Sequence, residues 1–288
     1  MPFITHETKD RNVDIYFKDY GQGQPVILIH GWPLSHRAWE QQIWAVVEAG
    51  YRCIAYDRRG FGHSDEPWGE FDYSTLASDL HSLIEQLELK DVILVGFSMG
   101  GGEVVRYCTD YGTDNLSKVA LISSIIPLVA QKEDNPNGVP QKELDNIMKA
   151  LQNDRVGFLK DFHKNFYNYE DLKDRVSEAQ LHYDWSIASH ASPRATIQAA
   201  KSWAETDFRS ELKNVNVPCL IVHGDADQIV PIKTSGDQAA KGIEHNRYEI
   251  IKNAPHGLNV THKDELNDIL LSFIKANVSE LIAEGEHI

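Results

Sequence analysis

The sequence predicts an α/β fold with a mostly parallel central sheet, and three observations support it. The chain has 288 residues, 42% hydrophobic and 25% charged, an ordinary globular composition with enough apolar residues for a large core. Short runs rich in β-branched residues recur, and most are continuously apolar, as in strands covered on both faces. Stretches with helical spacing lie between these runs, and this alternation is typical of α/β proteins.

Six apolar runs, each closed by turn residues, are the predicted strands. In chain order they are residues 26–29, 53–56, 92–95, 119–122, 219–222 and 248–251. A helix is predicted between the second and third strands, because five apolar residues there fall on one stripe that can pack on the sheet. These residues are Leu76, Leu80, Leu83, Ile84 and Leu87.

The interval between the fourth and fifth strands is too long for a simple crossover and indicates an inserted segment. Its pattern is helical: after Pro140 four apolar residues share one helix face, and three phenylalanines then repeat at every fourth position. We therefore expect a discontinuous core (1–125 and 211–277), a helical cap (126–210) and a C-terminal tail (278–288).

Charge and cysteine content exclude several classes of protein. With 43 acidic and 28 basic residues the formal charge is −15, which argues against nucleic acid or an anionic membrane surface as a partner. The longest nearly apolar run is too short to span a bilayer, and no signal-peptide pattern begins the chain. The three distant cysteines (Cys53, Cys108 and Cys219) are expected to be buried thiols, and the protein to be cytoplasmic.

The segment Gly96-Phe97-Ser98-Met99-Gly100 is the strongest catalytic motif. It follows a predicted strand and precedes a helical stretch, so the G-x-S-x-G pattern predicts a sharp turn that presents the Ser98 hydroxyl at the sheet edge. The glycines leave room where strand and helix backbones approach each other. We expect Ser98 to be a nucleophile, activated by a histidine that an acid orients.

The base and the acid should follow later strands. His256 comes directly after the last strand, between Pro255 and Gly257, and is favoured over His262, which is expected at the start of the final helix. The loop after the fifth strand offers both Asp225 and Asp227, and spacing alone does not choose between them. His223, still close to that strand, is expected to be structural.

An oxyanion hole needs two backbone N–H donors. One is expected from Met99, the residue after the nucleophile, and the other from the loop after the first strand, His30-Gly31-Trp32-Pro33. Because proline has no N–H, the Trp32 backbone is the expected second donor. His30 is expected to order this loop by hydrogen bonding.

Taken together, these segments resemble the α/β-hydrolase superfamily and, within it, the bacterial cofactor-free haloperoxidases, also described as perhydrolases and aryl esterases. The resemblance extends over nearly the whole chain. Besides the serine and histidine motifs it includes the His30 loop, the segment Tyr56 to Ser64 and the run His223-Gly224-Asp225-Ala226-Asp227-Gln228-Ile229-Val230-Pro231. The family's acid lies four residues before the proline of that run, which implies Asp227.

The resemblance also implies a reaction. Ser98 would attack a small ester to give an acyl-enzyme, which water converts to the acid and hydrogen peroxide to a peracid that oxidises halide. Family members that favour peroxide carry proline after the oxyanion-loop tryptophan, as here at Pro33. Proline fixes its own φ and can redirect the Trp32 carbonyl toward the pocket, where it could accept a hydrogen bond from peroxide.

The inserted segment resembles the family's cap. The expected acyl-pocket residues are Phe162 and Phe166, with Ile229 and Val230 beside the acid loop. No metal or cofactor is expected, because metal-ligand spacings and nucleotide-binding loops are missing from the sequence. The expected partners are a small ester or acid and hydrogen peroxide, and a homo-oligomer is possible. The open alternatives are a lactonase, a γ-lactamase, a C–C hydrolase and a non-catalytic receptor.

Overall fold

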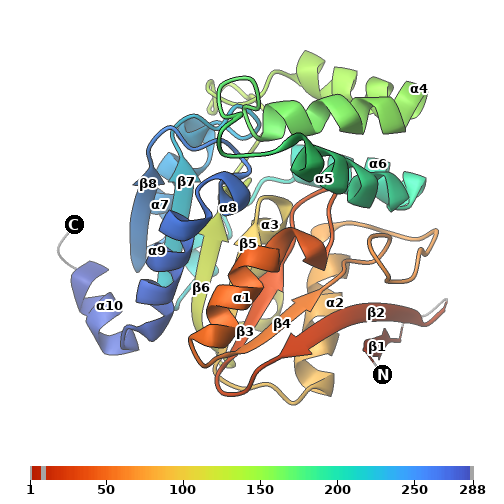
Figure 1. Ribbon diagram of the computed structural model, residues 1–288. Helices are drawn as coiled ribbons and strands as arrows, with labels where there is room; N and C mark the ends of the chain where they lie inside the picture. Colours follow the sequence, from red (N-terminus) through yellow and green to blue (C-terminus); the bar gives the residue numbers. More distant parts are fainter. Residues whose placement is uncertain (1, 8–10, 286–288) are drawn as a thin grey trace.

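An eight-stranded sheet with helices on both faces forms the body of the molecule, as the computed structural model shows (Figure 1). The structure describes residues 2–7 and 11–285. The sheet order is β1-β2-β4-β3-β5-β6-β7-β8. The strands from β3 to β8 run parallel, whereas β1 pairs antiparallel with β2 and β2 with β4. The predicted α/β class with a mostly parallel sheet is confirmed.

Six of the eight strands coincide with predicted runs. Their bounds are β3 (Pro25–Ile29), β4 (Arg52–Tyr56), β5 (Val92–Phe97), β6 (Leu116–Ile122), β7 (Cys219–Gly224) and β8 (Asn246–Ile251). The other two strands, β1 (Phe3–His6) and β2 (Val13–Tyr20) at the antiparallel edge, are not among the predicted runs. Asp14, Lys18 and Asp19 interrupt the apolar residues of β2, so the strand contains no continuous apolar run of the kind that predicts the others.

Helices cover both faces of the sheet (Figure 1). The element labels and bounds are α1 (Glu40–Glu48), α2 (Tyr73–Gln86), α3 (Met99–Tyr111), α7 (Gly236–Gly242), α8 (Leu258–Thr261), α9 (Lys263–Lys275) and α10 (Val278–Gly285), with short 3-10 helices η1 (His36–Trp39), η2 (Leu212–Asn214) and η3 (Ile232–Thr234). Four of the five predicted apolar residues lie in α2 and are fully buried, and the fifth, Leu87, follows the end of the helix. Of the expected tail, residues 278–285 form α10, and residues 286–288 lie outside the described part.

Three helices between β6 and β7 lie over the carboxyl edge of the sheet (Figure 1). They are α4 (Gln141–Phe166), α5 (Glu178–His190) and α6 (Pro193–Glu205), and we call them the cap helices. Non-helical dihedral angles at Asp154 divide α4 into two parts, which agrees with the two separate helical patterns in the sequence. The segment boundaries 126 and 210 stay a prediction.

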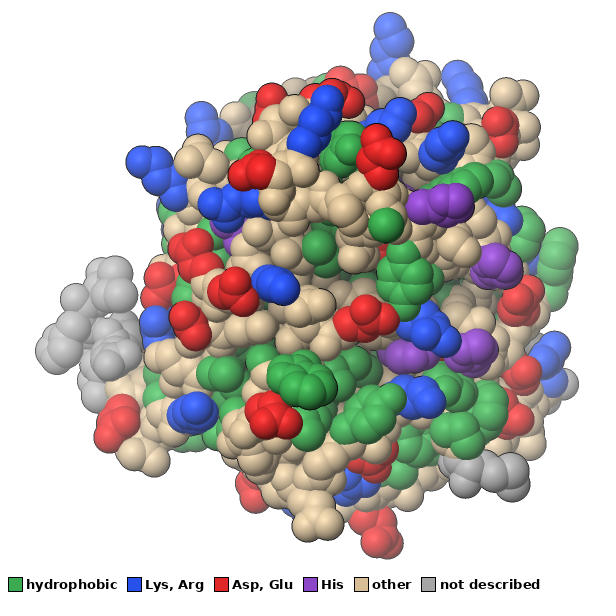
Figure 2. All heavy atoms as spheres, in the orientation of Figure 1, with side chains coloured by type: hydrophobic (Ala, Val, Ile, Leu, Met, Phe, Trp, Pro, Cys, Tyr) green, Lys and Arg blue, Asp and Glu red, His purple; other side chains and the backbone are tan. Residues whose placement is uncertain are grey.

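The surface carries charges of both signs, and one exposed apolar group stands out on the face seen in Figure 2. A hollow there is lined by Ile43, Trp44 and Val47 of α1 and by Tyr20 of β2, and 72% of Trp44 is exposed. The three cysteines are free and buried, as predicted. Among residues 2–7 and 11–285, no helix combines the length and apolar character that a membrane span requires.

Candidate active site

Ser98 stands at a sharp turn between β5 and α3. Its φ of +52° and ψ of −117° lie in a region that side chains other than glycine rarely adopt, so the surrounding backbone must hold it there. Gly96 and Gly100 permit this turn, because a Cβ on Gly96 would lie 2.5 Å from the Gly100 carbonyl oxygen and one on Gly100 equally close to that of Ile29. The turn places the serine at the N-terminus of α3.

A chain of two hydrogen bonds links Ser98 to His256 and Asp227. The Ser98 Oγ lies 2.9 Å from His256 Nε2, and His256 Nδ1 lies 2.7 Å from Asp227 Oδ2. The carboxylate can only accept at neutral pH, so Nδ1 carries the ring proton and Nε2 accepts from the serine hydroxyl. These three residues, which we call the triad, come from the ends of β5, β7 and β8.

The Asp227 carboxylate is buried and fully used as an acceptor. Its Oδ1 accepts the backbone N–H groups of Ile229 and Val230, at 2.9 and 2.8 Å. Burial opposes ionisation, but the charge of His256 and the hydrogen bonds from His223 and His256 outweigh it and hold the pKa of Asp227 well below its ordinary range. Asp227 is therefore ionised wherever the protein is folded at ordinary pH.

The alternative acid and base lie elsewhere. Asp225 is exposed, and its Oδ1 accepts the N–H of Asn253 at 2.5 Å, so it shapes the loops that follow β7 and β8. His262 is the residue before α9, as its position in the sequence predicts, and its Nδ1 lies 3.0 Å from the hydroxyl of its neighbour Thr261. The geometry thus brings Asp227 and His256, rather than Asp225 and His262, to the serine.

The loop that carries Trp32, one of the two expected oxyanion donors, passes directly beside the nucleophile. A Cβ on Gly31 would lie 3.1 Å from the Ser98 Cβ, so this glycine allows the loop to approach. Met99 is the first residue of α3, and its N–H is among those at the helix start that have no partner within the helix. The Trp32–Pro33 peptide bond is cis.

The indole of Trp32 fixes this loop to the cap helices. Its Nε1 donates to the carbonyl of Thr196 in α6 at 2.9 Å, and its ring packs against Phe162 of α4 and Trp203 of α6. Trp32 is 4% exposed, and every one of these contacts joins residues far apart in the sequence. The cap helices therefore determine where the Trp32 side chain lies.

A buried ion pair between Arg58 and Glu103 supports the loop of His30 and Trp32. The Arg58 guanidinium pairs with Glu103 of α3 and donates to the His30 carbonyl at 2.7 Å, while the Arg58 N–H donates to His30 Nε2 at 3.0 Å. Burial and the nearby Arg58 charge lower the pKa of His30 to about 3, so its ring is neutral. His30 therefore orders the loop, as expected, and the segment around Arg58 is a structural ion-pair turn. The role of Glu103 is not predicted from the sequence, although a charged residue five positions after the nucleophile, in a stretch of small and apolar residues, is a usable signal.

Aromatic side chains surround the triad histidine. The His256 ring lies 5.3 Å from Phe97 and 5.0 Å from Phe166, measured between ring centroids. Phe166 is fully buried and Phe162 is partly exposed beside Trp32. Ile229 is partly exposed and Val230 is buried, and both act on Asp227 through their backbone. Ser98 itself keeps 6% of its surface exposed.

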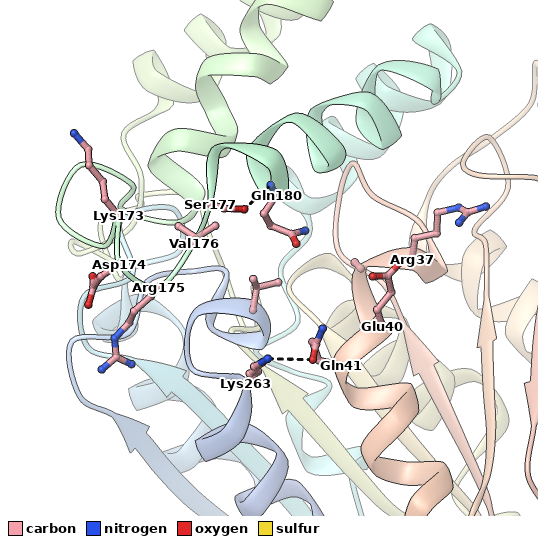
Figure 3. A pocket seen from close by; sticks show the side chains of 12 residues that line it. Arg37, Glu40, Gln41, Lys173, Asp174, Arg175, Val176, Ser177, Gln180 and Lys263 are labelled. Carbon is pink, nitrogen blue, oxygen red and sulfur yellow. Dashed lines mark hydrogen bonds between the residues drawn. The ribbon is translucent and has the colours of Figure 1, made fainter.

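A polar crevice of about 380 Å³ lies between the loop joining α4 to α5 and the core elements η1, α1 and α8 (Figure 3). In Figure 3, Lys173 and Arg175 extend away from its centre, and Lys263 donates to Gln41 at 3.4 Å. None of the triad residues lines it.

In the part of the chain that the structure describes, no group of three or more His, Cys, Asp or Glu side chains could hold a metal ion.

Known proteins are similar to this chain in sequence, and a solved structure is similar in fold, over almost their whole length. Residues 24–263 match the family described as alpha/beta hydrolase fold. The chain is 39% identical to a non-heme chloroperoxidase of Kitasatospora aureofaciens, with 95% of this chain and 99% of that protein covered. It is 35% identical to a bifunctional esterase/perhydrolase of Acinetobacter calcoaceticus, covering 96% and 100%. The crystal structure of a bromoperoxidase from Bacillus anthracis superposes with a TM-score of 0.91 at 46% identity, covering 95% and 100%. The chain belongs to the alpha/beta hydrolase fold family.

Proposed function

We propose that the protein is a serine hydrolase that cleaves small carboxylic esters through an acyl-enzyme, and that hydrogen peroxide can replace water as the second nucleophile. The observation that carries this proposal is the hydrogen-bonded chain from Ser98 Oγ through His256 to Asp227, with distances of 2.9 and 2.7 Å. Such a chain supplies a nucleophile, a general base and an orienting acid. The names of the relatives, chloroperoxidase and esterase/perhydrolase, agree with it.

In the first half-reaction, Ser98 Oγ attacks the ester carbonyl carbon while His256 Nε2 takes the hydroxyl proton. The negative charge on the carbonyl oxygen is stabilised by the N–H groups of Trp32 and Met99, and losing one such donor typically raises the barrier by about 3 kcal/mol. His256 then gives its proton to the departing alcohol, and the bond between the carbonyl carbon and the alcohol oxygen breaks. Asp227 stabilises the imidazolium throughout.

In the second half-reaction, His256 accepts a proton from water or from hydrogen peroxide as that molecule attacks the acyl carbon. The bond to Ser98 Oγ breaks, the serine recovers its proton from His256, and a carboxylic acid or a peracid leaves. A peracid released in this way oxidises bromide in solution. Starting from a free carboxylic acid, the same acyl-enzyme forms with loss of water.

The closed surroundings of the triad favour small acyl groups. Phe162 borders the Trp32 ring with a centroid distance of 5.3 Å, and we assign it to the wall of the acyl pocket together with Phe166, Ile229 and Val230. Pro33 follows the Trp32 carbonyl, which we assign as the acceptor that holds peroxide. The substrates are thus a small ester or acid and hydrogen peroxide.

Two assays on one variant test the proposal. Hydrolysis of p-nitrophenyl acetate and peroxide-dependent bromination of a dye in acetate buffer are measured for the wild type and for Ser98→Ala. We expect Ser98→Ala to lose both activities by at least about three orders of magnitude, because a single nucleophile serves both. Either activity at the wild-type level in Ser98→Ala contradicts the mechanism, and a wild type without ester turnover contradicts the function.

A further inference from the structure

The Asp227 carboxylate has a second histidine beside it. His223 Nε2 lies 3.2 Å from Asp227 Oδ2, the same oxygen that accepts from His256 Nδ1 at 2.7 Å. Thus two imidazole rings converge on one carboxylate oxygen, His223 from β7 and His256 from the loop after β8. Both rings are 1% exposed, so water does not compete for this oxygen.

The surroundings of His223 determine where its ring proton lies. Nε2 is 2.9 Å from the carbonyl oxygen of Val230 as well as 3.2 Å from the Asp227 carboxylate, and both groups are acceptors. The third neighbour, Ser235 Oγ at 3.4 Å, donates its own proton to the Pro231 carbonyl. Nε2 must therefore carry hydrogen: it donates to the Val230 carbonyl, and the Asp227 Oδ2 lies 3.2 Å from the same nitrogen.

Packing on both sides restricts the position of the His223 side chain. Its backbone pairs with Ile250 in the β7–β8 register, and its side chain packs against the start of α7, where a Cβ on Gly236 would lie 3.1 Å from the His223 Cβ. The N–H is thus held at the acid by the same strand that places the acid loop. The hydrogen bond from His223 also contributes to the lowered pKa of Asp227.

We propose that His223 is a positioning residue for the reaction: its Nε2–H holds Oδ2 of Asp227 in line with His256 Nδ1 and stabilises the carboxylate charge. This inference rests on the proposed function. With His223 in place the carboxylate has one orientation in which Oδ1 is occupied by two backbone N–H groups and Oδ2 by two imidazoles. Without it, Oδ2 keeps a single partner, and both the orientation and the charge of the carboxylate are less well defined.

The test compares two variants of His223 by the pH dependence of kcat/KM for p-nitrophenyl acetate. His223→Phe keeps a ring but removes the donor, and we expect kcat/KM to fall about ten- to hundredfold, the range for a hydrogen bond to a charged group. The carboxylate left with one partner attracts the proton of His256 more strongly, so the acid limb of the profile should move up by about one pH unit. His223→Gln, whose amide N–H can reach the same place, should restore most of both changes.

A merely structural role gives a different pattern. If His223 only supports the loop through Val230, His223→Phe lowers the melting temperature and the activity but leaves the acid limb in place, and this result overturns the proposal. Equal defects in the Phe and Gln variants overturn it as well. Thermal unfolding of each variant establishes how much of the loss comes from folding.

A readout without turnover separates this inference from the proposed function. The downfield proton resonance of the His256 Nδ1–H bond is recorded by NMR in the wild type and in His223→Phe. We expect the resonance to shift in the variant because Oδ2 has lost one of its donors. An unchanged resonance overturns the positioning role, even if the enzyme turns over no ester. If the wild type turns over no ester but the resonance shifts in His223→Phe, only the proposed function is contradicted.

Discussion

At the scale of single residues, two aspartates that lie two positions apart in one loop have opposite surroundings. Asp227 is buried against two histidines, and Asp225 is exposed and accepts one backbone N–H from Asn253. A carboxylate that orients an imidazole must be desolvated and within hydrogen-bond distance of the ring nitrogen. The geometry therefore assigns different tasks to side chains that the sequence alone leaves equivalent.

This difference gives a matched pair of variants. Asp227→Asn should lower kcat for ester hydrolysis by about four orders of magnitude, as the corresponding change does in serine proteases, because an amide no longer stabilises the imidazolium or its tautomer. Asp225→Asn keeps an oxygen acceptor for Asn253 and should stay within about threefold of the wild type. Steady-state kinetics on p-nitrophenyl acetate measure both, and a larger loss for Asp225→Asn would reverse the assignment.

Pro33 is the residue whose replacement tests the choice between peroxide and water. Pro33→Leu restores an N–H and frees φ at this position, which should move the Trp32 carbonyl away from the place proposed for peroxide. We expect the ratio of perhydrolysis to hydrolysis to fall about tenfold, while ester hydrolysis is retained. Peracid formation and acid release are measured on one ester with peroxide present. An unchanged ratio would contradict the role of the proline.

At the residue scale the sequence predicts the three residues of the triad, but not the side chains that hold them in place. Ser98 and His256 follow from motifs next to strands, because a G-x-S-x-G turn and a loop histidine are local patterns. The contact of His223 with Asp227, and that of Glu103 with Arg58, depend on which way side chains point within loops and across 45 positions of the chain. Local patterns contain no such information.

At the scale of elements, α5 carries a buried acid that is easier to bury protonated than charged. Asp184 accepts from the Tyr167 hydroxyl at 2.6 Å, and burial raises its pKa to about 6 despite this hydrogen bond. In the unfolded chain an aspartate has a pKa of about 3.9, so between this pKa and that of the folded state the folded protein binds the proton and the unfolded chain does not. The contribution of this group to stability is therefore most favourable below about pH 4 and declines as the pH rises toward about 6.

Replacement of Asp184 tests whether its contribution to the free energy of unfolding falls as the pH rises. Asp184→Asn removes the cost of the buried charge, and we expect it to raise the free energy of unfolding by about 1–3 kcal/mol at pH 7.5 and by distinctly less at pH 5. Urea unfolding at the two pH values measures the difference. The control is Asp161→Asn, an acid of α4 that is 78% exposed, which should change stability by under about 0.5 kcal/mol at both. An equal effect of Asp184→Asn at both pH values would contradict the titration.

Elements also differ in how well the sequence predicts them. The interior parallel strands are largely apolar runs that the sequence predicts, whereas β1 and β2 at the antiparallel edge mix buried and exposed positions and are not predicted. Among the cap helices, α4 is predicted from its helical spacing, whereas α5 and α6 lie in a segment predicted only as a helical whole. Their placement over the triad depends on tertiary contacts, such as the hydrogen bond from Trp32 to Thr196 across 164 positions, which periodicity does not contain.

On the scale of the whole molecule, the parallel sheet assembles the site. Residues 98, 227 and 256 are far apart in the chain, but each follows a parallel strand, and the carboxyl ends of such strands share one edge of the sheet. The sequence therefore predicted the gathering of the triad once the strands were found. The formal charge of −15 is spread over a surface that also carries many cations (Figure 2), and it favours solubility more than it defines the site.

The central claim is that one acyl-enzyme on Ser98 reacts with both water and hydrogen peroxide. The most direct measurement is rapid acid quenching of the wild type during turnover of p-nitrophenyl acetate, followed by mass spectrometry of its peptides, with and without peroxide. We predict an acetyl group on the peptide that contains Ser98, absent from Ser98→Ala, with a shorter lifetime when peroxide is present. An acetyl group on a different residue, or a lifetime on Ser98 that peroxide does not change while peracid still forms, would contradict the account.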